Sequence, residues 1–273
     1  MLTSLVLTLA VDEPTPLPRF LGRASHALLL RLLGERDPAL AAQLHDAQGP
    51  KPFTCSELVG AAPAGQGQLL APDRAAWLRF SGLDESVSRW LLALAADPPE
   101  RVELDRQTLR VAEATIDAAK HPWAGQITYQ ALCEEALSRR APPRRLALRH
   151  VSPTTFRSQG VNIPVPLPYL VFGSLLARWQ AFSPVAVSPD ALRYAQEMMA
   201  LARYHLRTQM VRLEERGERV GFVGESEFVL LNRDRYWGNV MALLAAYSDY
   251  AGLGGQTGMG MGQTRFLRPR PEG

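Results

Sequence analysis

The sequence has almost no lysine and almost no cysteine. Of its 30 basic residues only two are lysine, Lys51 and Lys120, and all the others are arginine. The two cysteines, Cys55 and Cys133, support neither a disulfide framework nor a cysteine-rich zinc site. Because arginine dominates elsewhere, a position that keeps lysine in this chain is a candidate for a specific role.

Long apolar runs are also absent. No run approaches the length of a membrane span. The first residues, MLTSLVLTLAVDEP, lack a basic segment and a small-residue cleavage site, so they predict a strand and not a signal peptide. With 273 residues, 47% hydrophobic and 21% charged, the chain is typical of a soluble globular protein with one large domain or two ordinary ones. We expect a cytoplasmic protein.

Positive charge is concentrated in the second half. Residues 1–140 carry 14 Lys/Arg and 17 Asp/Glu, a net charge of −3, and residues 141–273 carry 16 and 10, a net charge of +6. A basic half suits a polyanionic partner such as nucleic acid. An imbalance of this size also falls within ordinary scatter, so charge alone does not decide the function.

The first half alternates strand and helix patterns. Ser4–Val11 predicts a strand, and Gly22–Glu35 predicts a helix. Asp37 and Pro38 predict the N-cap and first turn of a second helix, which ends before Gly49. Later patterns predict a strand at Trp77–Gly82, a helix at Glu85–Ala96 that Asp84 can cap, and two strands around a turn at Arg101–Ile116.

The second half repeats this order of elements without a detectable sequence repeat. Its patterns predict a strand and turn at Leu146–Gly160, a helix at Pro166–Phe182, and two strands at Tyr204–Leu213 and Arg219–Leu231. A further helix is predicted at Arg233–Gly252, and a loop with a strand at Met261–Arg268. Two successive βαββαβ-like halves predict an α+β fold of two tandem ferredoxin-like (RRM-like) domains. Proline-rich Arg139–Arg145 places the junction between domains 1–140 and 141–273.

Six glycines fall within the twelve residues Ala251–Gly262. The predicted order of helix, glycine loop and strand is the reverse of a dinucleotide fingerprint or P-loop, in which the loop leads into a helix. A plain connection needs only one or two glycines. The cluster therefore favours a loop whose backbone N–H groups hold an anion or which packs closely on another segment.

The chain resembles the CRISPR repeat-processing endoribonucleases of the RAMP superfamily. A glycine-rich loop between the last helix and the last strand is similar to theirs. Further similar segments occur in the family's order, at Leu40–Ser56, His121–Gly125, Ser152–Trp179 and Gly221–Glu225. The resemblance implies metal-independent cleavage of precursor CRISPR RNA within repeats, with no cofactor. The 2′-OH attacks the phosphate, giving a 2′,3′-cyclic phosphate (or 3′-phosphate) and a 5′-OH end.

Such a reaction needs a base, an acid and positive charge near the phosphorane. His45 matches the family's catalytic position, although a histidine at a helix end also serves as a cap. Lys51 matches the family's loop lysine and would stabilise the charged transition state; the alternative is a solvated surface residue. His26, 19 residues before His45, is either a second acid or base or a core histidine, and the sequence leaves both open.

One feature departs from the family pattern. Some members use a tyrosine on the first helix, and the matching position here is Leu30, with no tyrosine nearby. A tyrosine-assisted mechanism is therefore disfavoured, and a pair of histidines is favoured. The catalytic histidines belong to the predicted domain 1–140, and the glycine-rich loop and RNA-binding surface to 141–273.

The basic second half is expected to hold the RNA, because arginine binds phosphate through a bidentate fork. The candidate RNA-binding residues are Arg144, Arg145, Arg149, His150, Arg157, Gly255, Gln256, Thr257, Gly258, Arg265 and Arg268. His150 is expected on a sheet edge. Expected partners are CRISPR repeat RNA, other CRISPR effector subunits and a second copy in a homodimer, and neither DNA nor a membrane.

Two other function classes compete with the endoribonuclease. Related RAMP subunits of CRISPR effector complexes share the fold and loop but hold RNA without cutting it. The pair His45 and Lys51 favours the enzyme. A small-molecule binder that uses the glycine-rich loop would need a cofactor motif, and the sequence contains no recognisable one.

Overall fold

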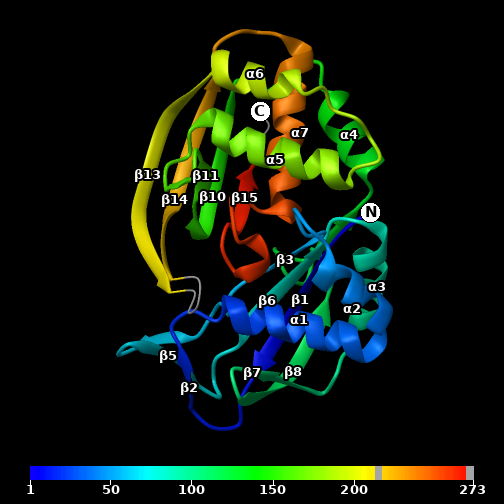
Figure 1. Cartoon of the computed structure of the whole chain (residues 1–273), viewed down its shortest axis with the longest axis vertical. Coiled ribbons are helices and arrows are strands. Elements are labelled where there is room, and N and C mark those ends of the chain that lie inside the picture. Colours follow the sequence, from blue (N-terminus) through cyan, green and yellow to red (C-terminus); the bar gives the residue numbers. More distant parts are fainter. Residues whose placement is uncertain (213–216, 269–273) are drawn as a thin grey trace. The chain divides into compact units, whose positions relative to one another are not determined.

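The computed structural model describes residues 1–212 and 217–268 (Figure 1). Its contacts divide into two compact units, each described separately below. The first unit contains Met1–Gln126 and Thr257–Met261, and the second contains Ile127–Gln256 and the segment that starts at Gly262. The division falls earlier than the expected junction at residue 140. A short piece of the glycine-rich loop belongs to the first unit.

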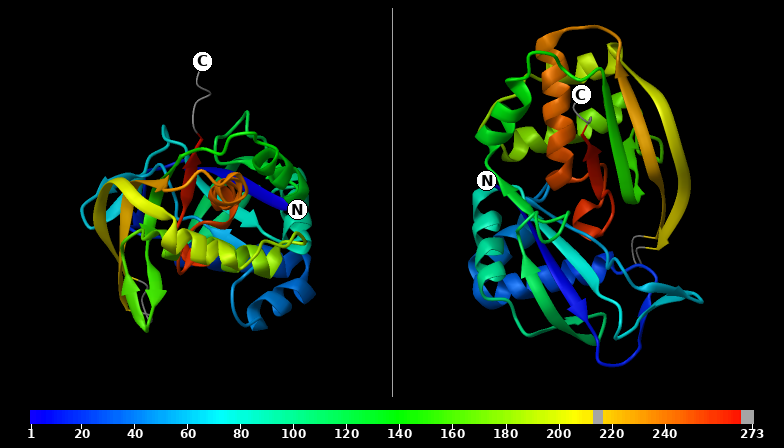
Figure 2. Two further views of the ribbon diagram at one scale, coloured as in Figure 1. Left: turned by 90° about the horizontal axis from the view of Figure 1, so that it is seen from above. Right: turned by 180° about the vertical axis from the view of Figure 1, so that it is seen from behind.

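An antiparallel sheet forms the framework of the first unit. In order across the sheet its main strands are β3 (Phe53–Cys55), β6 (Ala76–Gly82), β1 (Leu2–Ala10), β8 (Gln107–Thr115) and β7 (Arg101–Leu104). Helices α1 (Gly22–Arg36) and α3 (Glu85–Ala96) pack on one face (Figures 1 and 2). This order of strands and helices is that of a ferredoxin-like βαββαβ unit, so the predicted fold class is confirmed here.

Alternating leucines explain why β1 lies at the centre of the unit. Leu5, Leu7 and Leu9 are fully buried against the helices. A period of two places these leucines on one face of the strand, since successive side chains point to opposite faces. The intervening residues are mostly small or polar and face away from the helices.

Both predicted N-caps of this unit are confirmed. The Asp37 carboxylate accepts from the N–H of Leu40 at 2.9 Å and starts α2 (Pro38–Asp46). The Asp84 carboxylate accepts from the N–H of Val87 at 2.8 Å and starts α3. Short polar side chains satisfy N–H groups that the first helical turn leaves unpaired. Three strands of a smaller sheet and one short strand complete the unit's elements: β2 (Thr15–Pro18), β5 (Gly67–Leu70), β4 (Ala62–Ala64) and β9 (Gly125–Ile127).

The second unit has the same framework. In order across its sheet the strands are β13 (Met199–Arg212), β14 (Glu218–Leu230), β10 (Arg145–Thr154) and β15 (Thr264–Leu267). The unit's other elements are α5 (Pro168–Phe182), α7 (Arg235–Ala251), α6 (Asp190–Glu197), α4 (Tyr129–Leu137) and the hairpin β11 (Phe156–Ser158) and β12 (Val161–Ile163). Its strand order again matches the ferredoxin-like arrangement, with α5 and α7 as the two crossover helices (Figure 2).

Helix α4 explains why the units divide before residue 140. The aromatic rings of Tyr129 on α4 and Trp179 on α5 meet edge to face at 5.1 Å, and Trp179 meets Tyr247 on α7 at the same distance. All three side chains are buried. Such pairs stabilise a core beyond the area that they bury. Neither α4 nor α6 was predicted from the sequence.

The expectation that His150 lies on a sheet edge is wrong. Strand β10 pairs with β14 on one side and β15 on the other. His150 is 2% exposed, with its Nε2 2.9 Å from the Ser226 hydroxyl and its Nδ1 3.4 Å from the Thr264 hydroxyl. Burial lowers the pKa of His150 to about 3. Its side chain is therefore an internal, neutral group and is not presented to RNA on the surface.

His150 makes the second unit sensitive to acid. Below about pH 6.5 the unfolded chain takes up a proton on this histidine that the folded chain does not, so stability falls as the pH drops towards about 3. One such proton contributes a slope of about 1.4 kcal/mol per pH unit. Denaturant unfolding between pH 4 and pH 7 should show this contribution, and His150→Gln should flatten the curve. An unchanged slope in a folded variant would contradict the assignment.

Among the described residues, no helix has the length and apolar character needed to cross a membrane.

Candidate active site and RNA-binding surface

His26 touches the glycine-rich loop within the first unit. Its Nδ1 lies 2.9 Å from the carbonyl oxygen of Gly258, in the short 3₁₀ turn Thr257–Met259. The imidazole is half-buried on α1, and the Phe53 ring lies 5.6 Å away between centroids. His26 is therefore held by a polar contact with Gly258, which lies 232 residues later in the sequence. This contact favours a role at the loop over that of a core histidine.

His45 occupies the last turn of α2 and is largely exposed. Its side chain is 79% exposed, and Nδ1 lies 3.0 Å from the carboxylate of Asp46. An exposed imidazole beside a carboxylate can exchange protons with a bound substrate. Its position agrees with the catalytic role that the sequence assigns to it, which stays a prediction.

Lys51 binds the end of the helix that carries His45. Its ammonium group donates to the carbonyl oxygens of Leu44 at 2.7 Å, Ala47 at 2.6 Å and, more weakly, His45 at 3.3 Å. These carbonyls lack partners within the helix, and the C-terminal end favours a cation. All three donors of the ammonium are thus directed at the backbone. In this structure Lys51 positions the helix end, while direct contact with a phosphate remains a proposal.

The second unit anchors the start of the glycine-rich loop. Half-buried Arg178 donates to the carbonyl oxygens of Ala251 at 2.7 Å and Gly254 at 2.6 Å, and desolvation of its guanidinium group lowers its pKa to about 10. The N–H of Gly254 donates to the Ser174 hydroxyl at 3.0 Å. A Cβ at Gly254 would lie within 3.0 Å of the Thr155 carbonyl oxygen. Helix α5 therefore fixes the loop through side chains, and glycine permits the close approach.

These contacts correct the expectation that the loop's N–H groups form an anion site. The N–H groups of Gly254, Gly255 and Gly262 donate to Ser174, Thr155 and Pro153 respectively. A backbone N–H that already donates to protein oxygen is not offered to a phosphate. The anion-site interpretation is wrong for these three glycines.

The remaining loop candidates are buried or half-buried. Thr257 is 7% exposed, which leaves little of its side chain for RNA. Gln256 is half-buried, with φ of +60°. Gly258 contributes its carbonyl oxygen to His26. For Gly258 the contact that the structure shows is with the protein itself.

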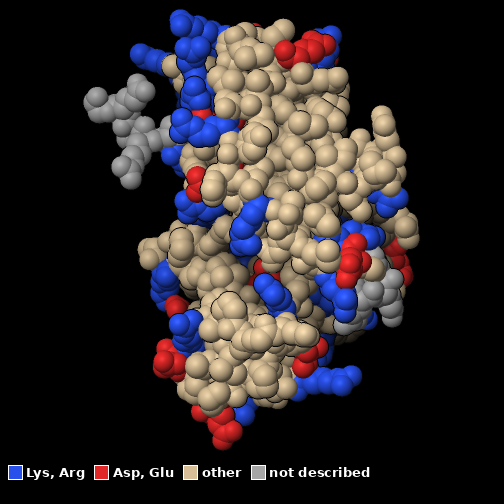
Figure 3. All heavy atoms as spheres, turned by 90° about the vertical axis from the view of Figure 1, so that its left-hand side faces the viewer, with Lys and Arg blue, Asp and Glu red and all other residues tan. Residues whose placement is uncertain are grey.

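The predicted arginines fall into two groups. Arg144 and Arg157 are exposed. Arg145, Arg149 and Arg268 form ion pairs with Glu227, Glu225 and Asp249 respectively, and Arg268 also approaches Glu135. The pairs of Arg145 and Arg149 are largely exposed and therefore weak, so these two guanidinium groups can exchange a carboxylate for a phosphate at small cost. The pair of Arg268 is of a different kind, because the Asp249 side chain is only 6% exposed. Figure 3 shows basic side chains gathered over parts of the second unit.

The sheet register brings several of these residues together in one row. Arg265, Arg149, Glu225 and His205 are successive cross-strand partners over β15, β10, β14 and β13. Partners of this kind share a face of the sheet. Arg203 and Arg207, which are also exposed, add two basic side chains on β13. Neither was selected as a candidate from the sequence. Arg207 lies within the predicted strand Tyr204–Leu213 and Arg203 directly precedes it, so their even spacing was the available signal.

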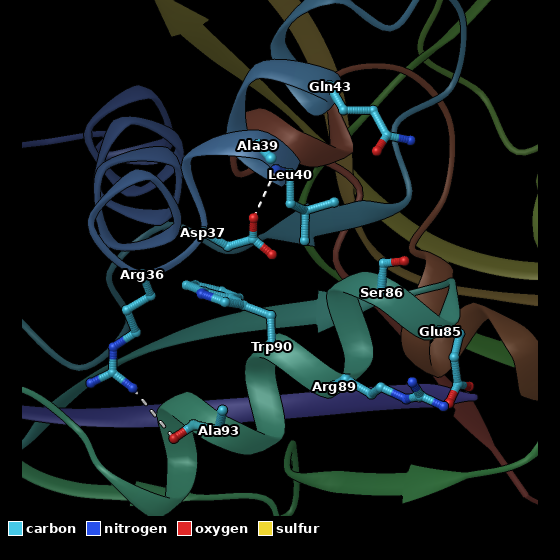
Figure 4. Close-up of a pocket in the computed structure, with 10 residues that line it drawn as sticks. All are labelled: Arg36, Asp37, Ala39, Leu40, Gln43, Glu85, Ser86, Arg89, Trp90 and Ala93. Atoms are coloured by element: carbon cyan, nitrogen blue, oxygen red, sulfur yellow. Dashed lines mark hydrogen bonds and ion pairs between the residues drawn. The ribbon is translucent and has the colours of Figure 1, made fainter.

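A cavity of about 610 Å³ lies beside α2 and α3 in the first unit (Figure 4). The close-up shows Asp37 and Leu40 on one side and Trp90 and Arg89 on the other. None of the predicted catalytic or RNA-binding residues lines it. The cavity is therefore a feature apart from the histidines and the loop.

No group of three or more His, Cys, Asp or Glu side chains that could hold a metal occurs among residues 1–212 and 217–268.

Two ferredoxin-like units, with a histidine held by a glycine-rich loop near the C-terminus, define a protein of the RAMP type. Two family models match consecutive parts of the chain: the CRISPR Cas6 N-terminal domain matches residues 1–134, and CRISPR-associated endoribonuclease Cas6 matches residues 148–264. The chain belongs to the Cas6 family of CRISPR-associated endoribonucleases.

Solved structures are similar over nearly the whole chain. One Cas6 product complex is 30% identical with a TM-score of 0.78, and a second is 28% identical with a TM-score of 0.80. In both comparisons 98% of this chain and 99% of the other are covered. A Cas6 from Thermus thermophilus is 27% identical over 98% of each chain, with a TM-score of 0.74.

A curated relative supports the same family over a shorter stretch. The CRISPR-associated endoribonuclease Cas6 of Streptococcus thermophilus is 30% identical over 114 residues. This match spans 41% of the present chain and 46% of the relative's length.

Lys51→Met should loosen the last turn of α2 while leaving the fold intact. It removes the donors from the carbonyl oxygens of Leu44 and Ala47, and one hydrogen bond contributes about 1 kcal/mol. Hydrogen exchange of amides in that turn should quicken about fivefold for each kcal/mol lost. Lys120→Met is the matched control, because the Lys120 ammonium forms an exposed ion pair with Glu113. Equal exchange in both variants would contradict the capping role.

Proposed function

We propose that this protein is a metal-independent endoribonuclease that cuts precursor CRISPR RNA within its repeats. The 2′-OH beside the scissile phosphate attacks, leaving a 2′,3′-cyclic phosphate (or 3′-phosphate) and a 5′-OH. The observation that carries the proposal is the pair of histidines in the first unit: His45 is exposed on a helix end held by Lys51, and His26 is bound to the loop. Cas6 product complexes that are similar over 98% of this chain support it.

The two histidines supply the proton transfers that the reaction requires. One takes the proton of the 2′-OH and the other gives a proton to the departing 5′-oxygen. An imidazole can both accept and donate a proton, so a pair of histidines can perform both steps. Lys51, at the end of α2, adds positive charge near His45. Its direct action on the phosphorane would require release of at least one helix carbonyl.

The RNA is proposed to lie against basic residues of the second unit. Arg144 and Arg157 are exposed, and Arg145 and Arg149 are half or more exposed within their ion pairs. Such residues contact the phosphate backbone, which fixes the register of an RNA without reading its sequence. Arg203 and Arg207 join this proposed surface. Binding should therefore weaken as salt rises.

Cleavage of a repeat RNA should persist in excess EDTA, because proton transfer by histidines needs no metal. The measurement is single-turnover cleavage with and without the chelator, followed by analysis of the product ends. A non-catalytic RNA-binding subunit would bind the RNA and release no products. Loss of cleavage in EDTA that magnesium restores would overturn the mechanism.

His45→Ala should slow single-turnover cleavage by about 10²–10⁴-fold, the usual contribution of general acid–base catalysis. RNA affinity should change little, since it depends on phosphate contacts elsewhere. Gln43→Ala, an exposed change on the same helix, is the matched control. A folded His45→Ala protein that cuts at the parent rate would remove the central residue of the proposal.

His26→Ala distinguishes a histidine pair from a single catalytic histidine. If both act in the same step, each single variant should lose a comparable factor, and the double variant should be little worse than either. A folded His26→Ala protein that retains the parent rate would assign His26 a structural role only.

A further inference from the structure

We propose that the glycine-rich loop is the positioning element of His26, and that the carbonyl oxygen of Gly258 selects the nitrogen that reacts. The proposal deepens the function proposed above and rests on it. It assigns to Gly258 and Gly260 a role through their backbone contacts with α1, in addition to any contact with RNA.

The hydrogen bond between His26 and Gly258 has only one possible direction. A carbonyl oxygen accepts and never donates, so Nδ1 of His26 must carry the proton across the 2.9 Å contact. In the neutral imidazole the other nitrogen, Nε2, then carries the lone pair. A fixed partner on one ring nitrogen selects the tautomer and the ring orientation of a histidine.

Close backbone contact brings this carbonyl to His26. A Cβ at Gly22, the first residue of α1, would lie within 3.0 Å of the Met259 carbonyl oxygen. A Cβ at Gly260, whose φ is +85°, would lie 2.7 Å from the Cα of Gly22. Each position therefore excludes a side chain, and φ at Gly260 independently favours glycine. Two glycines, 238 residues apart, let the loop rest directly on the helix.

A second contact holds the loop from the side of the sheet. Gly260 forms a parallel bridge with Ser56, directly after β3. A Cβ at Gly258 would lie 3.3 Å from the Phe53 ring and 3.7 Å from Nδ1 of His26. The loop is thus confined between α1 and the end of β3. A side chain at Gly258 would press on Phe53 beside the imidazole.

The proton transfers of the reaction are consistent with Nε2 as the reacting nitrogen of His26. The Nδ1 proton stays on the ring throughout, shared with Gly258. As a base, Nε2 accepts the proton of the 2′-OH while the oxygen attacks phosphorus; as an acid, protonated Nε2 gives its proton to the 5′-oxygen when the P–O bond breaks. In both cases the imidazolium that exists during the reaction remains hydrogen-bonded to the carbonyl.

The first experiment measures the tautomer of His26 in the parent protein. Long-range ¹H–¹⁵N correlation spectra of the full-length protein, recorded near pH 8, report which nitrogen of a neutral histidine is protonated. His26 is assigned as the signal that is lost in His26→Gln. The proposal expects the Nδ1–H tautomer. A dominant Nε2–H tautomer in the folded parent would overturn it.

The second experiment displaces the loop. Gly22→Ala places a methyl group where the Met259 carbonyl lies, and Gly260→Ala places one 2.7 Å from the Cα of Gly22. Gly34→Ala is the matched control on the same helix, because the nearest atom to its new Cβ would be the Ala41 Cβ at 3.9 Å. For each folded variant the tautomer signal, the single-turnover rate and the affinity for repeat RNA are measured together.

The expected result is a changed His26 tautomer signal and cleavage slowed by about 10²-fold, the scale of a small displacement of a catalytic group. Gly34→Ala should match the parent in all three measurements. A changed tautomer with an unchanged rate would overturn the positioning role, and an unchanged tautomer in folded Gly22→Ala would overturn the structural premise. A parent protein that does not cut repeat RNA would reject the proposed function, while the tautomer of the parent would still test the orientation.

Discussion

The backbone of the glycine-rich loop and the first turn of α1 approach each other more closely than side chains allow. Gly22 and Gly260 meet without Cβ atoms, and the contact brings the Gly258 carbonyl oxygen to 2.9 Å from His26. Residues separated by most of the chain thereby share one local arrangement. The first unit consequently includes Thr257–Met261, although the rest of its chain ends at Gln126.

Three polar side chains on which the site depends donate hydrogen bonds to backbone carbonyl oxygens. Lys51 donates to the end of α2, Arg178 to the end of α7 and to the loop, and His26 to the loop. Carbonyl groups at helix ends and in turns lack internal partners, and cationic donors satisfy them well. Each of these side chains fixes a segment of backbone. Lys51 was selected from the sequence as a positive charge that would stabilise the transition state. In the structure its ammonium group caps the C-terminal end of α2.

Local signals were sufficient for much of the fold. Asp37 and Asp84 marked two helix starts because a capping carboxylate and the first turn are neighbours in sequence. Alternating leucines marked β1 in the same way. Helix α4 was not predicted, although Thr128 caps its first turn. What places it in the fold is the contact of Tyr129 with Trp179 and Tyr247, far along the chain. His150 was misplaced because strand order, which decides edge or interior, is not a local property.

The sequence by itself determined the two βαββαβ halves, the candidate histidines and the concentration of glycine near the C-terminus, because each depends on spacing or composition along the chain. Only the tertiary structure decided what those glycines do. Their N–H groups at positions 254, 255 and 262 bind the protein, and the carbonyl at 258 faces His26. A glycine in the sequence shows only that a side chain is absent. Which backbone segment packs in the space that a Cβ atom would fill is decided by folding.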